Sequence, residues 1–461
     1  MRRFVAARRF LVVVLSGLIL AGISIASRSQ ATARAELSPN IIVVMTDDQR
    51  GGTTLRHMPY LRGLVAGGTS FEQYYATQPL CCPSRASYMT GLYPHHHGIT
   101  DNTPTWEEIA NVEARSLAPR LQQAGYTTAH IGKYLNGYAC DPGCTSPPYV
   151  PPGWDEWYGR VGPKTYYYEE RIFDGSSVRV LPGYSTDAYG ALAVDFIRRQ
   201  APVGVSPVDH PFFLEVMPIA PHDGAVNLGG KLRCGAIPAD RHFGQFADAP
   251  VPGRFARSKS FRDKPRRLRR IERRAACHWR RGLESLLAVD DMVANIDAAL
   301  RRSGLSEETV LIFTSDNGYD YGEHGVFGKD LPYDASAHVP LIVRGPGFHS
   351  PKSTKLVANI DLPVTIAELA GASLSGVDGR SLFASPRRRL LLEGGASKGG
   401  RVPVWRAVVT AHGRELIQWR KRRPRVEFYD LRKDPRQLHP IHGHRRQKQR
   451  LVRAVHSLAQ R

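Results

Sequence analysis

IIVVMTDDQ, residues 41–49, and VLIFTSDNG, residues 310–318, are the stretches that decide the expected fold. Each begins with a β-branched apolar run and ends in acidic and polar side chains, which favours a buried strand followed by a functional loop. Similar runs occur at 127–131, 212–217 and 341–343, and helical stretches lie between them. This alternation predicts an α/β fold, with a mainly parallel central sheet flanked by helices.

Residues 279–301 give the clearest helix, because apolar side chains recur there at helical spacing. They are Leu283, Leu286, Val289, Val293, Ile296 and Leu300. Shorter runs at 387–392, 405–410 and 415–419 predict strands of a small C-terminal unit. We expect a catalytic domain at 36–383 and a C-terminal α+β subdomain with a basic helical tail at 384–461.

The first 35 residues look like a targeting segment. Two arginine pairs precede an apolar run at 10–26, and Ala33-Arg34-Ala35 has the small-x-small pattern of a cleavage site. We expect a cleaved signal peptide, and a retained membrane anchor is the alternative because the run approaches the length of a bilayer span. Arg8-Arg9-Phe10-Leu11 also resembles a twin-arginine export signal. The expected location is therefore secreted or cell-envelope.

The chain carries a formal net charge of +21, and its basic residues are densest at 254–281. That stretch is either a solvated basic face or a contact for a sulfated polymer or other anion. No recognisable nucleic-acid-binding motif accompanies it, so nucleic acid is not an expected partner.

Six cysteines in an exported chain invite disulfide pairing. Cys140 with Cys144, and Cys234 with Cys277, are the plausible pairs. The remaining Cys81 and Cys82 are adjacent, and adjacent cysteines rarely bond to each other because the geometry is strained. At least one of these two therefore needs another explanation.

Acidic side chains stand one residue after the end of two of the expected strands. Asp47 and Asp48 follow the run at 41–45, and Asp316 and Asn317 follow the run at 310–314. Ligands gather at the carboxyl ends of parallel strands, and calcium prefers several oxygen ligands. Either pair alone would more often be a helix cap or a turn. Two pairs in the same topological place favour a metal site.

The sharpest motif is Cys81-Cys82-Pro83-Ser84-Arg85, which is followed by Thr90-Gly91. Pro83 suits the first turn of a helix and would place Cys81 just before the helix N-terminus, where backbone N–H groups favour an anion. The motif resembles that of the type I sulfatases, in which the first cysteine is oxidised to formylglycine. NIIVVMTDDQR, IGKYLNGY, APHD and TSDNGYDYGEHGVFGK fall in the order of that family. IGKYLN and HWRRGLESLLAVDD look most like the N-acetylglucosamine-6-sulfatase and extracellular glucosamine endosulfatase branch.

This resemblance implies an alkaline-phosphatase-like fold and a sulfuric ester hydrolase, a sulfatase that acts on a sulfated sugar such as 6-sulfated glucosamine. It also implies a formylglycine hydrate as nucleophile and a formylglycine-generating enzyme as maturation partner. One Ca²⁺ would be bound by Asp47, Asp48, Asp316, Asn317 and the modified Cys81. The implied catalytic residues are Cys81, Arg85, His97, Lys133, His222 and Lys329.

The chain departs from the family pattern in two places. Many sulfatases have a histidine two residues after the lysine of the Gly-Lys motif, where this chain has Leu135. His222 and Asp223 are followed by Gly224, where the branch usually continues with Ser and Pro. The alternatives are a phosphonate monoester or phosphodiester hydrolase of the same superfamily, or a catalytically silent, secreted glycan-binding protein.

Overall fold

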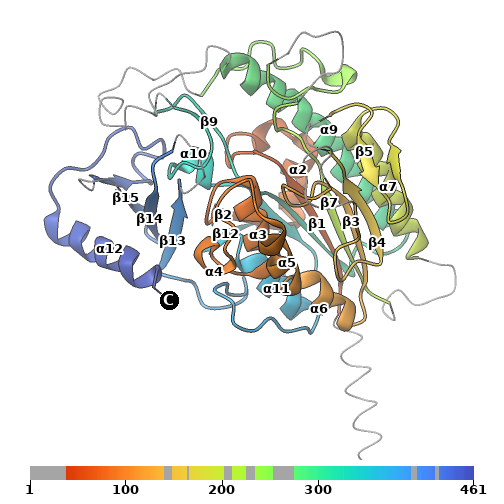
Figure 1. Ribbon diagram of the computed structural model, residues 1–461. Helices are drawn as coiled ribbons and strands as arrows, with labels where there is room; N and C mark the ends of the chain where they lie inside the picture. The colour runs from red at the N-terminus through yellow and green to blue at the C-terminus, as the bar shows by residue number, and fades with distance from the viewer. Residues whose placement is uncertain are drawn as a thin grey trace, which may run out of the picture.

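The computed structural model describes residues 38–139, 148–162, 166–201, 210–224, 234–252, 275–324, 326–395, 402–420 and 425–460. A ten-stranded sheet forms its centre, in the order β12-β2-β11-β8-β1-β7-β3-β4-β5-β6 (Figure 1). The strands are β1 (Asn40–Thr46), β2 (Gly68–Tyr75), β3 (Thr127–Gly132), β4 (Glu156–Arg160), β5 (Arg171–Phe173), β6 (Val178–Val180), β7 (Phe212–Met217), β8 (Thr309–Ser315), β11 (Leu341–Arg344) and β12 (Lys352–Ala358).

The middle of this sheet is parallel, as the sequence predicts. β1 pairs in parallel with β7 and β8, and β3 pairs in parallel with β7 and β4. The predicted run at 341–343 also forms a strand, but β11 is antiparallel to both β8 and β2. The sheet is therefore mixed, with a parallel centre.

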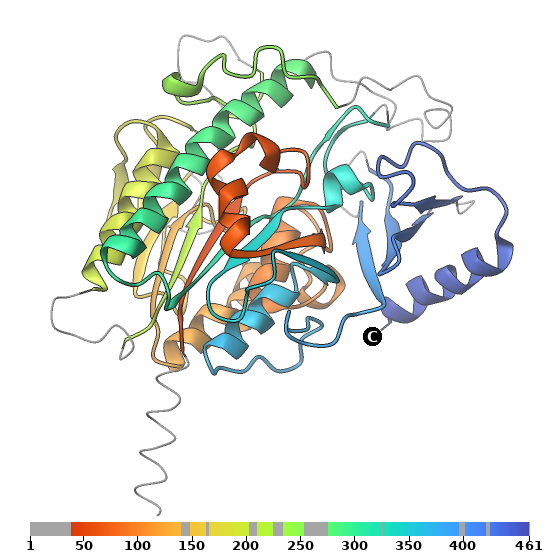
Figure 2. The ribbon, with the colours of Figure 1, turned by 180° about the vertical axis from the view of Figure 1, so that it is seen from behind.

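Helices cover both faces of the sheet, and alternate residues of β1 point into two different cores. Ile41, Val43 and Met45 belong to one core, while Ile42 and Val44 belong to the other. The first core lies under α3 (Cys81–Thr90), α5 (Trp106–Ala114), α6 (Leu117–Gln123) and α11 (Asp361–Leu369), on the face seen in Figure 1. The second lies under α2 (Pro59–Leu64), α7 (Ser185–Arg199) and α9 (Ala275–Arg302), on the face seen in Figure 2. α9 contains the whole helix predicted at 279–301.

Smaller elements complete the catalytic part of the chain. They are α4 (Pro94–His97), α10 (Asp334–Ala337), the two-stranded sheet of β9 (Asp320–Tyr321) and β10 (Phe327–Gly328), and short 3-10 helices at Leu55–His57, Val65–Gly67 and Asp240–His242.

The C-terminal subdomain is a separate antiparallel sheet in the order β13-β14-β15-β16. Its strands are β13 (Arg389–Gly394), β14 (Trp405–Thr410), β15 (Arg414–Trp419) and β16 (Arg425–Asp430), and the helix α12 (Arg445–Leu458) packs against β14 and β15. Three of these strands and the helix match the prediction, whereas β16 was not predicted. One apolar core joins this sheet to Tyr333 and Ile360 of the catalytic part.

Cys234 and Cys277 form a disulfide, which agrees with the predicted pairing, and Cys81 and Cys82 are free and buried. The first 35 residues, the pair Cys140 and Cys144, and most of the basic stretch at 254–281 lie outside the described residues. Within the described part of the chain, no helix combines the length and the apolar character that crossing a membrane requires.

Candidate active site

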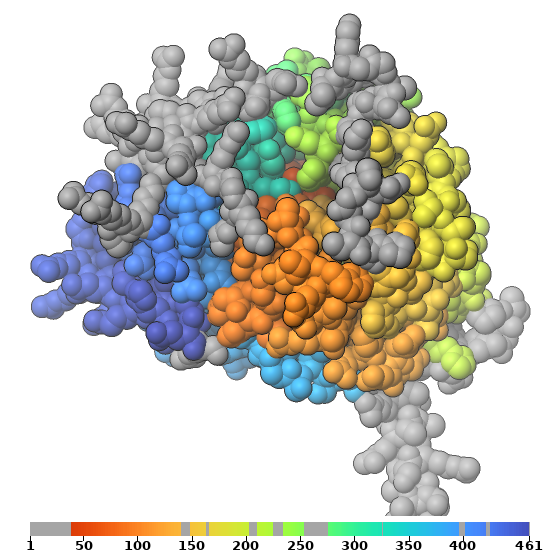
Figure 3. All heavy atoms as spheres, viewed as in Figure 1, coloured from red at the N-terminus to blue at the C-terminus, as the bar shows by residue number. Residues whose placement is uncertain are grey.

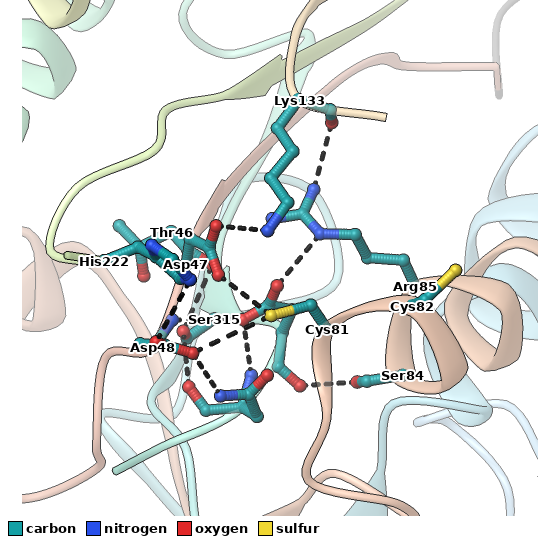
Figure 4. A network of polar contacts seen from close by, with 12 residues as sticks. Thr46, Asp47, Asp48, Cys81, Cys82, Ser84, Arg85, Lys133, His222 and Ser315 are labelled. Carbon is teal, nitrogen blue, oxygen red and sulfur yellow. Dashed lines mark hydrogen bonds and ion pairs between the residues drawn. The ribbon is translucent and has the colours of Figure 1, made fainter. Parts of the chain in front are cut away.

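The two acidic pairs predicted from the sequence lie side by side, at the carboxyl ends of the neighbouring central strands β1 and β8. Thr46 and Ser315, the last residues of β1 and β8, are paired in register, so the loops that follow them leave the sheet together. The backbone N–H of Asp48 donates to Asp316 Oδ1 at 3.1 Å, and Asn317 Nδ2 donates to Asp48 Oδ1 at 2.6 Å. Figure 4 shows this cluster from close by.

The cluster has the chemistry of a divalent cation site. Asp47, Asp48, Cys81 and Asp316 are buried, and each offers a ligand atom within 4.8 Å of the others. Asn317 Oδ1 is buried as well and has no hydrogen-bond partner in the described structure. A buried oxygen without a hydrogen-bond partner, beside three carboxylates, is energetically costly unless it coordinates a cation. These residues therefore fit an ion with oxygen ligands, such as Ca²⁺.

Cys81 is the first residue of α3 and not the residue before it. Leu80 has the extended backbone of the N-cap, so Cys81 and Pro83 both lie in the first turn, where the missing N–H of proline costs no helical hydrogen bond. Cys81 Sγ lies 3.3 Å from Asp47 Oδ1 and 2.6 Å from Lys329 Nζ. Burial, and then the charge of Asp47, raises the pKa of the Cys81 thiol.

Three cations surround the carboxylates, and each comes from a different element. Lys133 follows β3 and forms an ion pair with Asp47, and Arg85 Nε on α3 donates to Asp316 Oδ2 at 2.9 Å. Lys329 follows β10 and donates to Asp48 Oδ1 at 2.5 Å. Burial alone would raise the pKa of Asp47, but Lys133 and the neighbouring cations hold it well below its usual value.

Local backbone geometry aims Lys133 into the cluster. Gly132, the last residue of β3, has a φ of 107°, in the region that favours glycine. A Cβ at this position would lie 2.3 Å from the carbonyl oxygen of Met217 in β7. The carbonyl of Lys133 accepts a hydrogen bond of 3.0 Å from Arg85 Nη1. Arg85 Nη2 is buried without a hydrogen-bond partner, which leaves a donor free in the described site.

His222 lies at the solvent-exposed side of the cluster. Its side chain is 29% exposed, and its Nε2 lies 3.8 Å from Asp48 Oδ2. Its Nδ1 lies 2.8 Å from the carbonyl oxygen of Asp223. Nδ1 is therefore protonated and donates a hydrogen bond to this carbonyl. The Asp223 carboxylate pairs with His278 Nδ1 on α9 at 2.9 Å. Sequence reasoning missed His278, because 55 residues separate it from Asp223 and no local pattern links them.

His97 lies apart from the metal-type cluster. It belongs to α4, and its Nε2 is 3.1 Å from Ser87 Oγ, more than one turn along α3 from Cys81. Burial lowers the pKa of His97 to about 3, so its ring is neutral. Among the described residues, the side-chain hydrogen bonds of His97 are with Ser87 and the N–H of Ile99 and not with Cys81, so its catalytic role stays a prediction.

The chain has an alkaline-phosphatase-like fold, with a central sheet covered by helices on both faces, acidic loops at the ends of β1 and β8, and a small C-terminal antiparallel sheet. Residues 39–372 match the family model described as Sulfatase. The chain belongs to the sulfatase family.

Some relatives carry the names of the branch that the sequence motifs resemble. The chain is 32% identical to the extracellular sulfatase SULF-1 homolog of Drosophila melanogaster, over 77% of this chain and 32% of that protein. It is 32% identical to an arylsulfatase of Volvox carteri, over 74% of this chain and 56% of that protein, and 31% identical to human N-acetylglucosamine-6-sulfatase, over 75% and 64%. The chain thus spans from just under one third to just under two thirds of the length of these relatives.

Solved structures share the fold over nearly the whole chain. The structure of BT4656 in complex with its substrate D-glucosamine-2-N,6-O-disulfate is similar at a TM-score of 0.74 and 24% identity, covering 91% of this chain and 97% of that one. The phosphonate monoester hydrolase of Agrobacterium radiobacter is similar at a TM-score of 0.66 and 20% identity, covering 91% and 95%. At these identities the likeness concerns the fold, which sulfatases and phosphonate hydrolases share.

Proposed function

We propose that this protein is a sulfatase that hydrolyses a sulfate ester of a sugar, such as 6-sulfated glucosamine. The observation that carries the proposal is the position of Cys81, whose Sγ lies at a helix start between Asp47 and Lys329. Membership of the sulfatase family supports the reaction. The names of the relatives, N-acetylglucosamine-6-sulfatase and extracellular sulfatase, support the sugar.

The proposal includes formylglycine at position 81 and one bound Ca²⁺. Cys81 Sγ marks the place from which an oxygen of the hydrated aldehyde would face the carboxylate cluster. The hydrate would supply the hydroxyl that attacks sulfur, and the cation would stabilise negative charge on the oxygens around it. Asp47, Asp48, Asp316 and Asn317 would hold the cation, and the unpartnered Oδ1 of Asn317 favours its membership of this set.

The cations of the site would hold the sulfate group of the substrate. Lys133 and Lys329 enter the cluster from different strand ends, so their ammonium groups would bind different sulfuryl oxygens. Arg85 is fixed through Nε and Nη1, and its free Nη2 would donate to the group at position 81. These donors are in place before substrate arrives, because buried carboxylates and carbonyls already orient them.

His222 would provide the proton for the leaving alcohol. Its Nδ1 is engaged by the carbonyl of Asp223, so Nε2 is the nitrogen that faces the cluster. When the ring is doubly protonated, Nε2 also carries a proton, and this proton would pass to the departing sugar oxygen as the S–O bond breaks. The partial exposure of His222 suits this task, since the alcohol must leave toward solvent.

The test replaces the two adjacent cysteines separately. Cys81→Ala removes the precursor of the nucleophile and should abolish hydrolysis of an aryl sulfate while the fold remains intact. Cys82→Ala is the matched control, because Cys82 is equally buried but faces the carbonyl of Asn136. Mass spectrometry of the peptide that contains residue 81 should show the aldehyde in active wild-type protein.

Two results would contradict the proposal. Near-normal aryl sulfate hydrolysis by Cys81→Ala would exclude Cys81 as the source of the nucleophile. Faster cleavage of a matching phosphonate monoester than of the aryl sulfate would place the protein in the alternative hydrolase class that shares its fold.

We also propose that the chain is exported before it acts. The apolar segment at 10–26 with its arginine pairs supports export, and relatives named extracellular sulfatases are compatible with it. Conversion of Cys81 would need a formylglycine-generating enzyme during maturation, since a buried thiol at a helix start must be oxidised before or during folding.

A further inference from the structure

A second basic site lies in the C-terminal subdomain, which forms one side of the molecule in Figure 3. A groove of about 550 Å³ runs between α12 and β16, the edge strand of the small sheet. Its lining includes the cations Arg445, Lys448 and Arg453, the amide of Gln449, and the apolar side chains of Val426 and Val452. Figure 1 shows α12 on the outer side of this subdomain, away from α3 and the catalytic cluster.

The buried residues of α12 fix how the helix lies beside β16. Leu451, Ala454 and Val455 are buried against the small sheet and fix the orientation of the helix. Arg445, Lys448 and Arg453 all line the groove, so they lie along the part of α12 that faces β16. The rise of an α-helix separates the first from the last by roughly 12 Å along the axis.

The groove has an uncompensated positive charge. Among the residues that the structure describes, no acidic residue contributes to its lining, and residues 439–461 contain no Asp or Glu. Across the described parts of the chain, neither Arg445 nor Arg453 forms an ion pair, and Lys448 Nζ lies over the Phe428 ring, 5.9 Å from its centroid. By contrast, the cavity between α7 and α9 contains Arg241 already paired with Asp187 and Asp291. The α12 groove therefore keeps its cations available for a ligand.

The spacing of the cations selects the kind of anion. A single small anion would contact one or two of these side chains, whereas a chain with repeated anionic groups would contact all three. Arginine binds oxyanions such as sulfate through parallel N–H groups, and Gln449 adds amide donors for hydroxyl oxygens. Val426 and Val452 offer apolar surface to the faces of sugar rings.

We propose that the α12–β16 groove binds a sulfated glycan chain at a place separate from the catalytic cluster. The choice of a sulfated glycan over other polyanions rests on the proposed function. A groove of this kind would hold a polymeric substrate near the enzyme while successive sulfate esters are presented to the catalytic site. Since the contacts are largely electrostatic, their strength falls with rising ionic strength.

The test compares two triple variants that lose the same charge. The groove variant, Arg445→Gln/Lys448→Gln/Arg453→Gln, removes the three cations that line the groove. The control variant, Arg446→Gln/Arg450→Gln/Lys433→Gln, removes three exposed cations of the same subdomain that lie outside the groove. The probe is fluorescently labelled dextran sulfate at low ionic strength, with unsulfated dextran and polyglutamate as comparisons. We expect the groove variant to raise the Kd for dextran sulfate by about tenfold or more relative to the control variant. Unsulfated dextran should not bind.

Equal weakening by the two variants would overturn the proposal, because binding would then follow net charge alone. Polyglutamate binding as tight as that of dextran sulfate would overturn the assignment to a sulfated glycan. Both variants should hydrolyse a small aryl sulfate at the wild-type rate, since neither changes the catalytic cluster. If wild-type protein hydrolysed no aryl sulfate but kept groove-dependent binding, the proposed function would fail and the binding site would stand.

Discussion

Asp48 concentrates the contacts of the candidate site in one side chain. Its carboxylate accepts hydrogen bonds from Asn317 Nδ2 and Lys329 Nζ and lies 3.9 Å from Cys81 Sγ and 3.8 Å from His222 Nε2. Its backbone has a φ of 73°, a conformation that aspartate tolerates better than most residues. Because Asp48 would be a metal ligand and also contacts Lys329, a proposed sulfate-binding residue, it would connect metal binding with substrate binding.

The first prediction concerns this ligand role. Ca²⁺ at about 100 times its Kd should stabilise the folded wild-type protein by about 2.7 kcal/mol, because the ion binds only the folded state. Asp48→Asn removes one charged ligand and should greatly reduce this calcium-dependent rise in the thermal unfolding temperature. Asp195→Asn, at an exposed position far from the cluster, is the control and should keep it. An unchanged calcium effect in Asp48→Asn would exclude Asp48 from the metal site.

The second prediction concerns His222 and the leaving group. A proton donor matters most when the departing alcohol is a poor leaving group, and general acid catalysis typically contributes about 10²–10⁴-fold. His222→Gln should therefore lower kcat/KM by about 10²-fold or more for a sugar 6-sulfate, and much less for nitrophenyl sulfate, whose leaving group needs little protonation. The same loss for both substrates would show that His222 holds the sulfate and does not donate the proton.

Among the elements, α3 depends on a buried polar connection to the sheet. Tyr88 on α3 donates to Glu215 Oε1 in β7 at 2.8 Å, and Glu215 Oε2 lies 2.8 Å from His130 Nδ1 in β3. These three elements also carry or precede Arg85, Lys133 and His222. One buried carboxylate thus connects the elements that carry or precede Arg85, Lys133 and His222, the proposed proton donor.

The third prediction tests this connection with matched tyrosines. Tyr88→Phe leaves Glu215 with an unsatisfied oxygen and should destabilise the fold by about 1–3 kcal/mol. It should also lower kcat for an aryl sulfate, because α3 loses its fixed orientation. Tyr126→Phe removes a similar hydrogen bond, 2.8 Å long, to the carbonyl of Pro39 at the opposite edge of the sheet.

Urea unfolding and steady-state kinetics of the two variants provide the comparison. Both variants should lose stability, but only Tyr88→Phe should lose kcat. Equal kinetic behaviour would mean that the connection through Glu215 serves stability alone.

The whole molecule shows which features a sequence pattern can reveal. The central strands were predicted because β-branched runs in a parallel sheet are continuous and end in polar loops, as at 41–49 and 310–318. β2 and β12 were missed because they carry mixed polar and apolar residues and lie at one edge of the sheet. The acidic pairs could be predicted because each follows the end of a recognisable strand. Lys329 follows a strand of only two residues, which is too short to recognise in the sequence, so only the family resemblance indicates it.

Contacts between the C-terminal subdomain and the catalytic part were not predictable from local patterns. Asp330, next to Lys329, has a left-handed backbone with a φ of 61° and is buried. Its carboxylate accepts the N–H of Gly395 at 3.0 Å, and its carbonyl accepts Trp405 Nε1 at 2.9 Å. Its own N–H donates to the carbonyl of Pro79, two residues before Cys81, at 2.7 Å. The small sheet therefore holds the segment that carries Lys329 against the segment that leads to Cys81.

The last prediction uses the titration of Asp330. Burial raises the pKa of this carboxyl to about 7, and the hydrogen bond from Gly395 opposes the shift only in part. An acid with a raised folded-state pKa binds its proton more tightly in the folded protein, so its contribution to stability is present at low pH and is lost as the pH rises from about 4 to about 7. Asp330→Asn cannot ionise and should not show this loss. The free energy of unfolding of wild type, relative to that of Asp330→Asn, should thus be lower at about pH 8 than at about pH 5, as measured by urea unfolding.

The control is Asp195→Asn. The difference in the free energy of unfolding between wild type and Asp195→Asn should show no such fall. A constant difference between wild type and Asp330→Asn across this range would mean that Asp330 is ionised throughout, and that the small sheet holds a permanent negative charge beside Lys329.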